Sequence, residues 1–333
     1  MAQFDFLAVG DIVTEPFIRL KDARVHCNMK DEDCEICMRW GDKIPYESAT
    51  PVVAVGNAPN AAVSAARLGL ISSLQAYVGE DEQGKECIEV LKKEGVDTSL
   101  MVIEKGKQTN HHFVLWYEDE RTILVKHEEF NYQLPRLVEE PQWMYLSSLS
   151  DNSLPYQEAW AAQLELWKGT KLAFQPGTFQ IKLGTQSLKK IYKRTDVFFC
   201  NKQEAEHITG NPSGSEVKTL LEALQKLGPK TVVMTDDTRG AYARAESGEM
   251  YHCPRYPDPR PPFEITGAGD AFASTTTAAL ALGKELPEAL RWGATNASAV
   301  LQEIGAQKGL LTREELEQHL TNPPQKFEVE KIT

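Results

Sequence analysis

The sequence predicts an α/β fold in which helices cover both faces of a mainly parallel central sheet, with a small β-sheet lid beside it. The first observation is that short apolar strands alternate with helical segments along most of the 333 residues, which is typical of a parallel sheet. The second is that two regions break this alternation. Residues 14–51 are rich in charge and cysteine, and residues 108–127 indicate a hairpin. We expect these two regions to form the lid.

The core elements follow one another in chain order. The first strand is FDFLAVGD, and a strand, a Gly/Asn/Pro turn and a small-residue helix follow in VVAVGNAPNAAVSAARLGL. Next come the strand SSLQAYVGED and the helix EQGKECIEVLKKEGV. The hairpin in HHFVLWYEDERTILVKHE turns near Asp119, and the later strands are PQWMYLSSL, TKLAFQPG, TDVFFCN and KTVVMTDD. The expected core spans residues 1–13, 52–107 and 128–333, and the expected lid spans residues 14–51 and 108–127.

The composition is that of an ordinary globular protein with an acidic balance. Hydrophobic residues make up 41% and charged residues 25% of the chain, and the formal net charge is −12. This charge argues against general binding to nucleic acids or anionic membranes, since both need a basic surface. The N-terminus lacks the basic and apolar regions of a signal peptide, and no stretch approaches the length of a membrane span. We therefore expect a cytoplasmic protein.

The segment EITGAGDAFAS, residues 264–274, places an aspartate directly after a glycine-rich turn. Apolar residues at helical spacing follow, so Gly267, Ala268 and Gly269 are expected to form the first turn of a helix. The exposed amides of a helix start attract anions. Asp270 then lies beside an anion site, which suits a base acting on a group that is about to be phosphorylated.

Two further segments lie at the ends of predicted strands, where ligands of parallel sheets bind. In CNKQEAEHITG, Asn201 and Glu204 suit a magnesium ion with retained waters, although a helix N-cap with a first-turn acid also fits this spacing. In VVMTDDTRGAYAR, Thr235 and Gly240 suit a nucleotide, and an ordinary hairpin turn is the alternative. A third segment, GEDEQGKE, is close to a P-loop but has Glu86 where Ser or Thr would bind magnesium. It is expected to be a loop that caps a helix.

Three of the six cysteines cluster in the expected lid, in HCNMKDEDCEIC. Cys27, Cys34 and Cys37, with His26 beside them, could hold a structural zinc ion. His26 and Cys27 are neighbours, however, and neighbours on a strand point to opposite faces, so a bend would be needed. Plain reduced thiols are the favoured interpretation, and a zinc site and a redox-sensitive pair are the alternatives.

Taken together, these motifs resemble those of the PfkB, or ribokinase-like, carbohydrate kinases along nearly the whole chain. The family's N-terminal signature resembles VGNAPNAAVSAARLG, and its C-terminal signature resembles EITGAGDAFAS. Its N-x-x-E motif is similar to NKQE, and its adenine-covering segment is similar to ATNASAVLQEIGAQ. The resemblance implies a three-layer α/β/α core with a β lid, and phosphorylation of a primary alcohol with ATP and Mg²⁺.

The resemblance also implies roles for individual residues. Asp270 matches the catalytic base, and Gly267, Ala268 and Gly269 match the anion hole. The implied acceptor-binding residues are Asp11, Glu15, Gly56, Asn57 and Asn60, and the implied nucleotide- and metal-binding residues are Asn201, Glu204, Thr235, Asp237, Gly240 and Asn296. Of these, Glu204 would hold Mg²⁺ through water.

Several positions depart from the family pattern. Glu15 stands where the family usually has aspartate, and its extra methylene changes which hydroxyl group it reaches. Asp237 stands where many members have glycine in the nucleotide loop. Glu264 replaces the usual aspartate near a point where members often bind a monovalent cation, so potassium activation is left open. The cysteine-rich insert near residues 26–43 is not a general family feature.

The expected function is ATP-dependent phosphorylation of a hydroxymethyl group on a sugar such as ribose or fructose. A nucleoside kinase of the adenosine type is the alternative, and a non-catalytic sugar or nucleotide sensor is a second one. The expected partners are small molecules, without nucleic acid or membrane, and a homodimer through the lid is left open.

Overall fold

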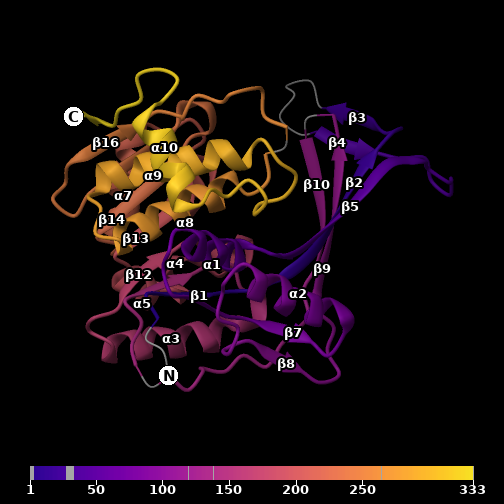
Figure 1. Cartoon of the computed structure of the whole chain (residues 1–333), viewed down its shortest axis with the longest axis horizontal. Coiled ribbons are helices and arrows are strands. Elements are labelled where there is room, and N and C mark those ends of the chain that lie inside the picture. The colour runs from indigo at the N-terminus through magenta and orange to yellow at the C-terminus, as the bar shows by residue number, and fades with distance from the viewer. Residues whose placement is uncertain (1–3, 28–33, 119, 138, 264, 333) are drawn as a thin grey trace.

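The computed structural model describes residues 4–27, 34–118, 120–137, 139–263 and 265–332, which form a large helix-covered sheet and a smaller lid sheet (Figure 1). Within these residues the main sheet has nine strands in the order β17–β16–β15–β14–β13–β12–β11–β1–β6. The pairs from β6 to β14 are parallel, and the pairs from β14 to β17 are antiparallel. The mainly parallel sheet predicted from the sequence is confirmed, with antiparallel strands added at one edge.

The bounds of the core elements are as follows. The strands of the main sheet are β1 (Phe6–Val9), β6 (Ser72–Gln75), β11 (Trp143–Leu146), β12 (Lys171–Phe174), β13 (Val197–Asn201), β14 (Thr231–Thr235), β15 (Ala241–Arg244), β16 (Met250–Cys253) and β17 (Glu330–Ile332). The helices are α1 (Asn57–Arg67), α2 (Glu82–Lys93), α3 (Leu154–Leu166), α4 (Thr178–Ser187), α5 (Lys189–Arg194), α6 (Lys202–Thr209), α7 (Val217–Lys226), α8 (Ala268–Ala281), α9 (Leu286–Val300) and α10 (Arg313–Thr321). Single 3₁₀ turns occur at Asp151–Ser153 and Asp237–Arg239.

Alternate residues of the parallel strands pack against different sets of helices. Phe6 and Ala8 of β1 belong to the core shared with α1, α2, α8, α9 and α10, whereas Leu7 and Val9 belong to the core shared with α3, α5, α6 and α7. Because both faces are buried, the inner strands β1 and β11 carry only apolar or aromatic residues. The predicted three-layer arrangement is therefore present. Among the described residues, no helix is both long and apolar enough to cross a membrane.

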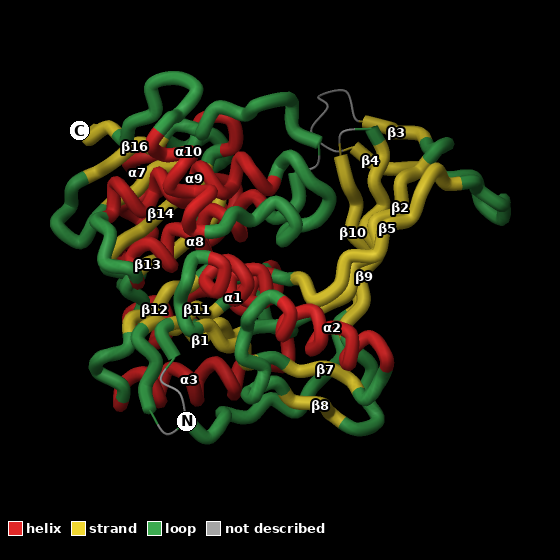
Figure 2. Tube along the Cα trace, in the orientation of Figure 1, coloured by secondary structure: helices red, strands yellow, loops and turns green. Residues whose placement is uncertain are grey.

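The lid is a separate four-stranded sheet in the order β10–β9–β2–β5. Its strands are β2 (Val13–Leu20), β5 (Tyr46–Val55), β9 (Asn110–Tyr117) and β10 (Glu120–Lys126). β9 and β10 form the hairpin expected from the sequence, and β2 pairs with β9 in parallel and with β5 in antiparallel orientation. Figure 2 shows this sheet standing beside the core. The lid thus joins two parts of the chain that are distant in sequence.

Two small pairs of strands accompany these sheets. β3 (Arg24–Cys27) and β4 (Cys34–Cys37) form a hairpin on the lid side, and β7 (Tyr77–Gly79) pairs with β8 (Val102–Glu104) in the core (Figure 1). Between β7 and α2, the Asp81 carboxylate accepts a hydrogen bond from the backbone N–H of Gly84 at 2.9 Å. The segment GEDEQGKE is therefore a helix-capping loop, as the sequence predicts.

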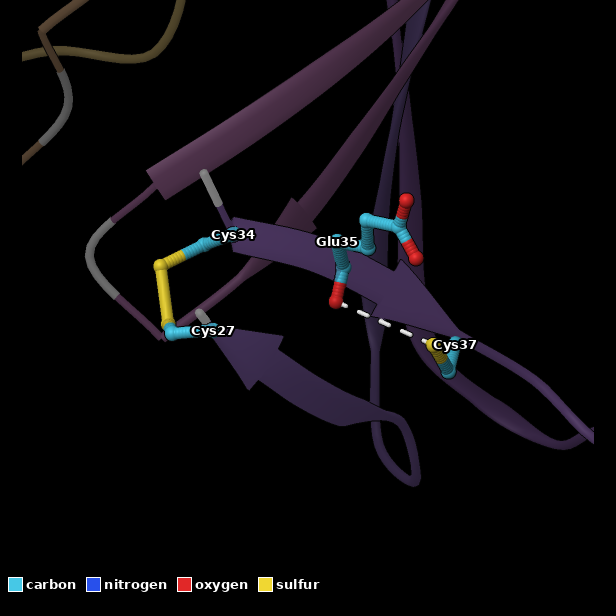
Figure 3. The surroundings of a disulfide bond; sticks show 4 residues. All are labelled: Cys27, Cys34, Glu35 and Cys37. Carbon is cyan, nitrogen blue, oxygen red and sulfur yellow. Dashed lines mark hydrogen bonds between the residues drawn. A yellow bond between two sulfur atoms is a disulfide. The ribbon is translucent and has the colours of Figure 1, made fainter. Parts of the chain in front are cut away.

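The structure contradicts two interpretations of the cysteine cluster. Cys27 and Cys34 form a disulfide across the β3–β4 hairpin, so in this structure they are neither zinc ligands nor reduced thiols (Figure 3). Cys37 is a free, exposed cysteine on β4, and its thiol contacts the carbonyl oxygen of Glu35. The disulfide joins directly opposite residues of the hairpin, whereas Cys34 and Cys37 lie on one strand at a spacing that points them to opposite faces. In the described part of the chain, no group of three or more His, Cys, Asp or Glu residues is arranged to hold a metal ion.

Candidate active site

The helix start predicted in EITGAGDAFAS is present. α8 begins at Ala268, and Gly267 precedes it with a φ of +84°, in the left-handed region. A Cβ atom at Gly267 would lie 2.2 Å from the Cβ atom of Ala306, so any larger residue would collide there. The N–H groups of the first turn have no acceptor inside the helix, and Gly267 brings no capping side chain to them. The turn therefore presents donors that suit an anion. Glu264, the position discussed for a monovalent cation, lies outside the described residues.

Three amide side chains hold the carboxylate of Asp270. Asn57 donates to Oδ1 at 2.7 Å, Gln175 donates to the same oxygen at 3.1 Å, and Asn60 donates to Oδ2 at 2.9 Å. The orientation of Asn60 is set by Gln307, whose Nε2 donates to Asn60 Oδ1 at 3.0 Å. Asn57 and Asn60, which the family resemblance assigns to binding of the phosphoryl acceptor, thus contact the candidate base. Gln175 was not identified from the sequence, although a polar residue directly after a buried strand is a usable signal for this edge of the sheet.

The surroundings of Asp270 change its basicity. Removal from water raises the pKa of Asp270, and the charge of Glu15 raises it further. Hydrogen bonds from Asn60, Gln175 and Asn57 lower this pKa without cancelling the rise. A carboxylate with a raised pKa is a stronger base, which suits proton abstraction near neutral pH.

Asn201 and Glu204 form a capping box at the start of α6. The Asn201 side chain accepts from the Glu204 backbone N–H at 2.8 Å, and the Glu204 carboxylate accepts from the Asn201 backbone N–H at 2.8 Å. The N-cap interpretation of this segment is confirmed, yet both residues also line the cavity that holds Asp270. Removal from water, helped by the charge of Asp270, raises the pKa of Glu204 against the hydrogen bond from Asn201. A cation at this place would relieve both carboxylates, so the residues fit a Mg²⁺ ion that keeps some of its waters.

A cavity of about 320 Å³ joins these groups. Its lining includes Asp270, Glu204, the start of α8 and, from the lid, Arg121 of β10. The Nε atom of Arg121 is shielded from solvent and has no hydrogen-bond partner among the described residues. A buried cationic donor of this kind calls for an anionic ligand. Arg121 was missed in the sequence, because only the packing of the lid beside the core brings β10 to this cavity.

A second cavity, of about 260 Å³, adjoins the first and shares Thr235 and Gly269 with it. Its lining is mostly apolar and comes from the loop after β14 and from α8 and α9, and it includes Asp237 and Gly240. Three predicted nucleotide positions, Thr235, Asp237 and Gly240, are therefore brought together. β14 and β15 also form the hairpin named as the alternative, so the hairpin turn and the cavity wall are the same feature.

Asn296, which the resemblance places in a nucleotide-contacting segment, is not among the residues that line these two cavities. Its side chain is fully buried, donates to Thr275 Oγ1 at 2.7 Å and accepts from the backbone N–H of Leu311 at 2.9 Å. The next residues on α9, Ala297 and Ser298, line the second cavity instead. The helical rotation thus turns Asn296 towards Thr275 of α8 and leaves its neighbours at the cavity.

Gly56 brings the start of α1 close to the loop after β1. Its φ is +123°, and a Cβ atom there would lie 2.9 Å from the carbonyl oxygen of Asp11. Only glycine allows this approach, which places Asn57 and Asn60 within hydrogen-bond distance of Asp270. Gly56 therefore shapes the site through the backbone.

The carboxylates of Asp11 and Glu15 are joined by two histidines. Glu15 Oε1 lies 2.9 Å from Nδ1 of His112, and Nε2 of His112 lies 3.2 Å from Nε2 of His127. Nδ1 of His127 in turn lies 3.1 Å from Oδ2 of Asp11, which also accepts a hydrogen bond from the Tyr132 hydroxyl at 2.7 Å through Oδ1. Glu15 lies on β2 and His112 on β9, whereas Asp11 follows β1. Lid and core thus meet through this chain, and neither histidine was identified from the sequence.

Comparisons with known proteins agree with this architecture. Residues 27–313 match the profile of the pfkB family carbohydrate kinases. The chain is 25% identical over 281 residues to the 5-dehydro-2-deoxygluconokinase of Bacillus subtilis, covering 79% of this chain and 86% of that protein. It is 27% identical over 271 residues to the ribokinase of Haemophilus influenzae, covering 78% and 85%.

A solved structure shares the fold. The structure of Arabidopsis thaliana ribokinase, complexed with ribose and ATP, superposes with a TM-score of 0.76 at 18% identity, covering 96% of this chain and 100% of that one. The family match extends over most of the sequence and includes the segments that form both cavities. The chain therefore belongs to the pfkB family of carbohydrate kinases.

Proposed function

We propose that the protein phosphorylates a hydroxymethyl group of a sugar, such as ribose, fructose or a related compound, with ATP as the donor. The observation that carries this proposal is the carboxylate of Asp270, held by three amide donors beside the amide-rich start of α8. A base and an anion site at one point are what transfer of a phosphoryl group to an alcohol needs.

Asp270 takes the proton of the acceptor hydroxyl as that oxygen attacks. The raised pKa of Asp270 improves this proton transfer near neutral pH. The amide donors from Asn57, Asn60 and Gln175 keep the carboxylate in one orientation, so little rearrangement is needed during the reaction.

The negative charge of the moving phosphoryl group is met by two features of the chain. The first-turn amides of α8, at Gly267, Ala268 and Gly269, are fixed donors that need no reorganisation. Arg121 reaches the same cavity from the lid with a donor, Nε, that has no partner in the described part of the chain. Glu204 would hold Mg²⁺ through water, with Asn201 capping the same turn, and this ion, when bound with ATP, neutralises phosphate charge.

The residues proposed to bind the phosphoryl acceptor favour a sugar. The carboxylates of Asp11 and Glu15 are hydrogen-bond acceptors suited to hydroxyl groups. The relatives named ribokinase and 5-dehydro-2-deoxygluconokinase support a sugar or a sugar acid, and a relative named nucleoside kinase keeps a nucleoside as the alternative.

The test is a phosphorylation screen with ATP and Mg²⁺ in which ADP formation is followed. Ribose, fructose, 5-dehydro-2-deoxygluconate and adenosine are the first acceptors, and Asp270→Asn purified in parallel controls for contaminating kinases. We expect acceptor-dependent ADP formation from a sugar by the wild type alone. Turnover of adenosine only would favour the nucleoside alternative, and equal turnover by both proteins would contradict the assignment of Asp270.

A further inference from the structure

The series of hydrogen-bonded side chains that runs from Glu15 through His112 and His127 to Asp11 contains more contacts than two neutral histidines can satisfy. Three contacts lie in series, from Glu15 to His112, from His112 to His127 and from His127 to Asp11. Ionised carboxylates only accept hydrogen bonds, so each histidine must donate through Nδ1. A neutral imidazole has one N–H group, which leaves both Nε2 atoms as acceptors that face each other at 3.2 Å. Two neutral rings therefore satisfy only two of the three contacts.

One further proton allows all three contacts to be hydrogen bonds, whichever of the contacting atoms carries it. The place is shielded from water, since His112 is 8% and Asp11 is 3% exposed. Hydrogen bonds that involve charged groups are strong in such surroundings. From α4, the ring of Phe179 packs edge-on against His127 at 5.3 Å, and Lys182 Nζ lies 5.8 Å from the centre of the Phe179 ring. The aromatic ring thus covers one side of His127.

The other charged groups near this chain have partners of their own. On the segment around His127, Lys126 donates to Gln108 at 2.7 Å, and Glu128 pairs with Lys107 at 3.4 Å. On the core side, the Tyr132 hydroxyl donates to Asp11 Oδ1 at 2.7 Å, and the oxygens of Asp270 accept from three amides. The number of protons in this series of side chains is therefore determined by its two carboxylates and two imidazoles.

We infer that His112 and His127 share one proton that holds Glu15 of the lid to Asp11 of the core, and that tight binding of the acceptor requires this proton. The inference rests on the proposed function, in which Glu15 and Asp11 accept the hydroxyl groups of a sugar. Histidine is the side chain that changes charge between about pH 5 and 8. As the pH rises and the shared proton leaves, the two Nε2 atoms repel and Glu15 loses its support. Affinity for the acceptor then falls while affinity for ATP is kept.

Two variants distinguish the effect of the shared proton from the effect of the His112 hydrogen bonds. In His127→Gln, the new amide N–H can donate to Nε2 of a neutral His112, so His112 keeps a partner for both ring nitrogens without a third proton. We expect kcat/KM for the acceptor to lose its fall at alkaline pH in this variant. His112→Phe removes both contacts of that ring, and the KM for the acceptor should rise about 10-fold or more, the size of one hydrogen bond to a charged group, with the KM for ATP unchanged.

The adjacent histidine provides a matched control. His111 lies on the same strand but points to the opposite face, where its ring packs against Phe113 at 4.8 Å. His111→Gln should keep the wild-type KM values and the wild-type pH profile. An alkaline fall that persists unchanged in His127→Gln would overturn the inference, as would a wild-type profile without any such fall.

Histidine NMR of the ¹⁵N-labelled full chain tests the shared proton without turnover. We expect a low-field N–H resonance and joint titration of two rings in the wild type and in His111→Gln, and loss of both features in His112→Phe and His127→Gln. If no acceptor is phosphorylated but this signature is present, the shared proton stands and the proposed function fails. Two rings that titrate independently, without the resonance, would overturn the shared proton even in an active kinase.

Discussion

The side-chain nitrogen of Asn57 lies 2.7 Å from Oδ1 of Asp270, although the two residues are 213 positions apart in the chain. The contact joins the start of α1 to the start of α8, so two glycine-led helix starts meet at one cavity. It also lowers the pKa of Asp270, against the rise caused by removal from water. A residue that is distant in the sequence thus contributes to the basicity of this carboxylate.

Removing the Asn57 amide should move the pH dependence of turnover. Because this hydrogen bond lowers the pKa of Asp270, Asn57→Ala should raise that pKa further. The base is then protonated up to a higher pH, so the acid limb of the kcat profile shifts upwards and turnover recovers as the pH rises. Asn131→Ala is the control, since the exposed Asn131 side chain bonds with Glu104 of β8 instead of Asp270. Superimposable profiles for the wild type and Asn57→Ala would refute the role.

Asp270→Asn should bind nucleotide as the wild type does and lose most of its turnover. General-base catalysis contributes about 10²–10⁴-fold, and the amide cannot take the acceptor proton. Steady-state kinetics with calorimetric titration of ATP separate the two effects. Turnover near the wild-type level would show that another group takes the proton.

Replacing Arg121 should slow phosphoryl transfer, because it removes the cationic donor that the lid contributes to the cavity. Arg121→Ala should lower kcat by about 10²-fold, the effect of losing one donor to developing charge, and Arg121→Lys should recover part of the loss. The control is Arg24→Ala, which removes an exposed arginine of the lid side. Equal kcat values for Arg121→Ala and Arg24→Ala would place Arg121 outside the reaction.

The KM for the acceptor, rather than that for ATP, should respond to Glu15. Its carboxylate lies on the lid strand β2 and is held by His112, where it can accept hydroxyl groups. Glu15→Ala should therefore raise the KM for the acceptor. Glu47→Ala is a matched lid variant, since Glu47 pairs with Arg19 on the exposed surface. If the KM for ATP moves instead, Glu15 belongs to the nucleotide site.

Thiol titration should distinguish the disulfide from the zinc site. In the structure Cys37, Cys87, Cys200 and Cys253 are free, so the denatured, unreduced protein should show these four thiols, and all six cysteines after reduction. Cys34→Ser should add one free thiol, that of Cys27. Metal analysis of untagged protein should accompany the titration. About one zinc per chain with six free thiols before reduction would restore the zinc interpretation.

The sequence by itself determined the α/β class, the lid hairpin, the helix start at Ala268 and the capping loop at Asp81, and it left the cap at Asn201 as an alternative. These features depend on neighbouring residues, through apolar periodicity, glycine conformation and capping hydrogen bonds, so they can be seen locally. The tertiary structure alone decided which remote side chains meet. In the folded protein Asn57 and Asn60 contact Asp270, and Asn296 lies in the interior. Arg121 lines the cavity. Two histidines link Glu15 to Asp11. A disulfide pairs Cys27 with Cys34. Such contacts depend on strand register, helix rotation and the placement of the lid beside the core, and the packing of the whole chain sets these.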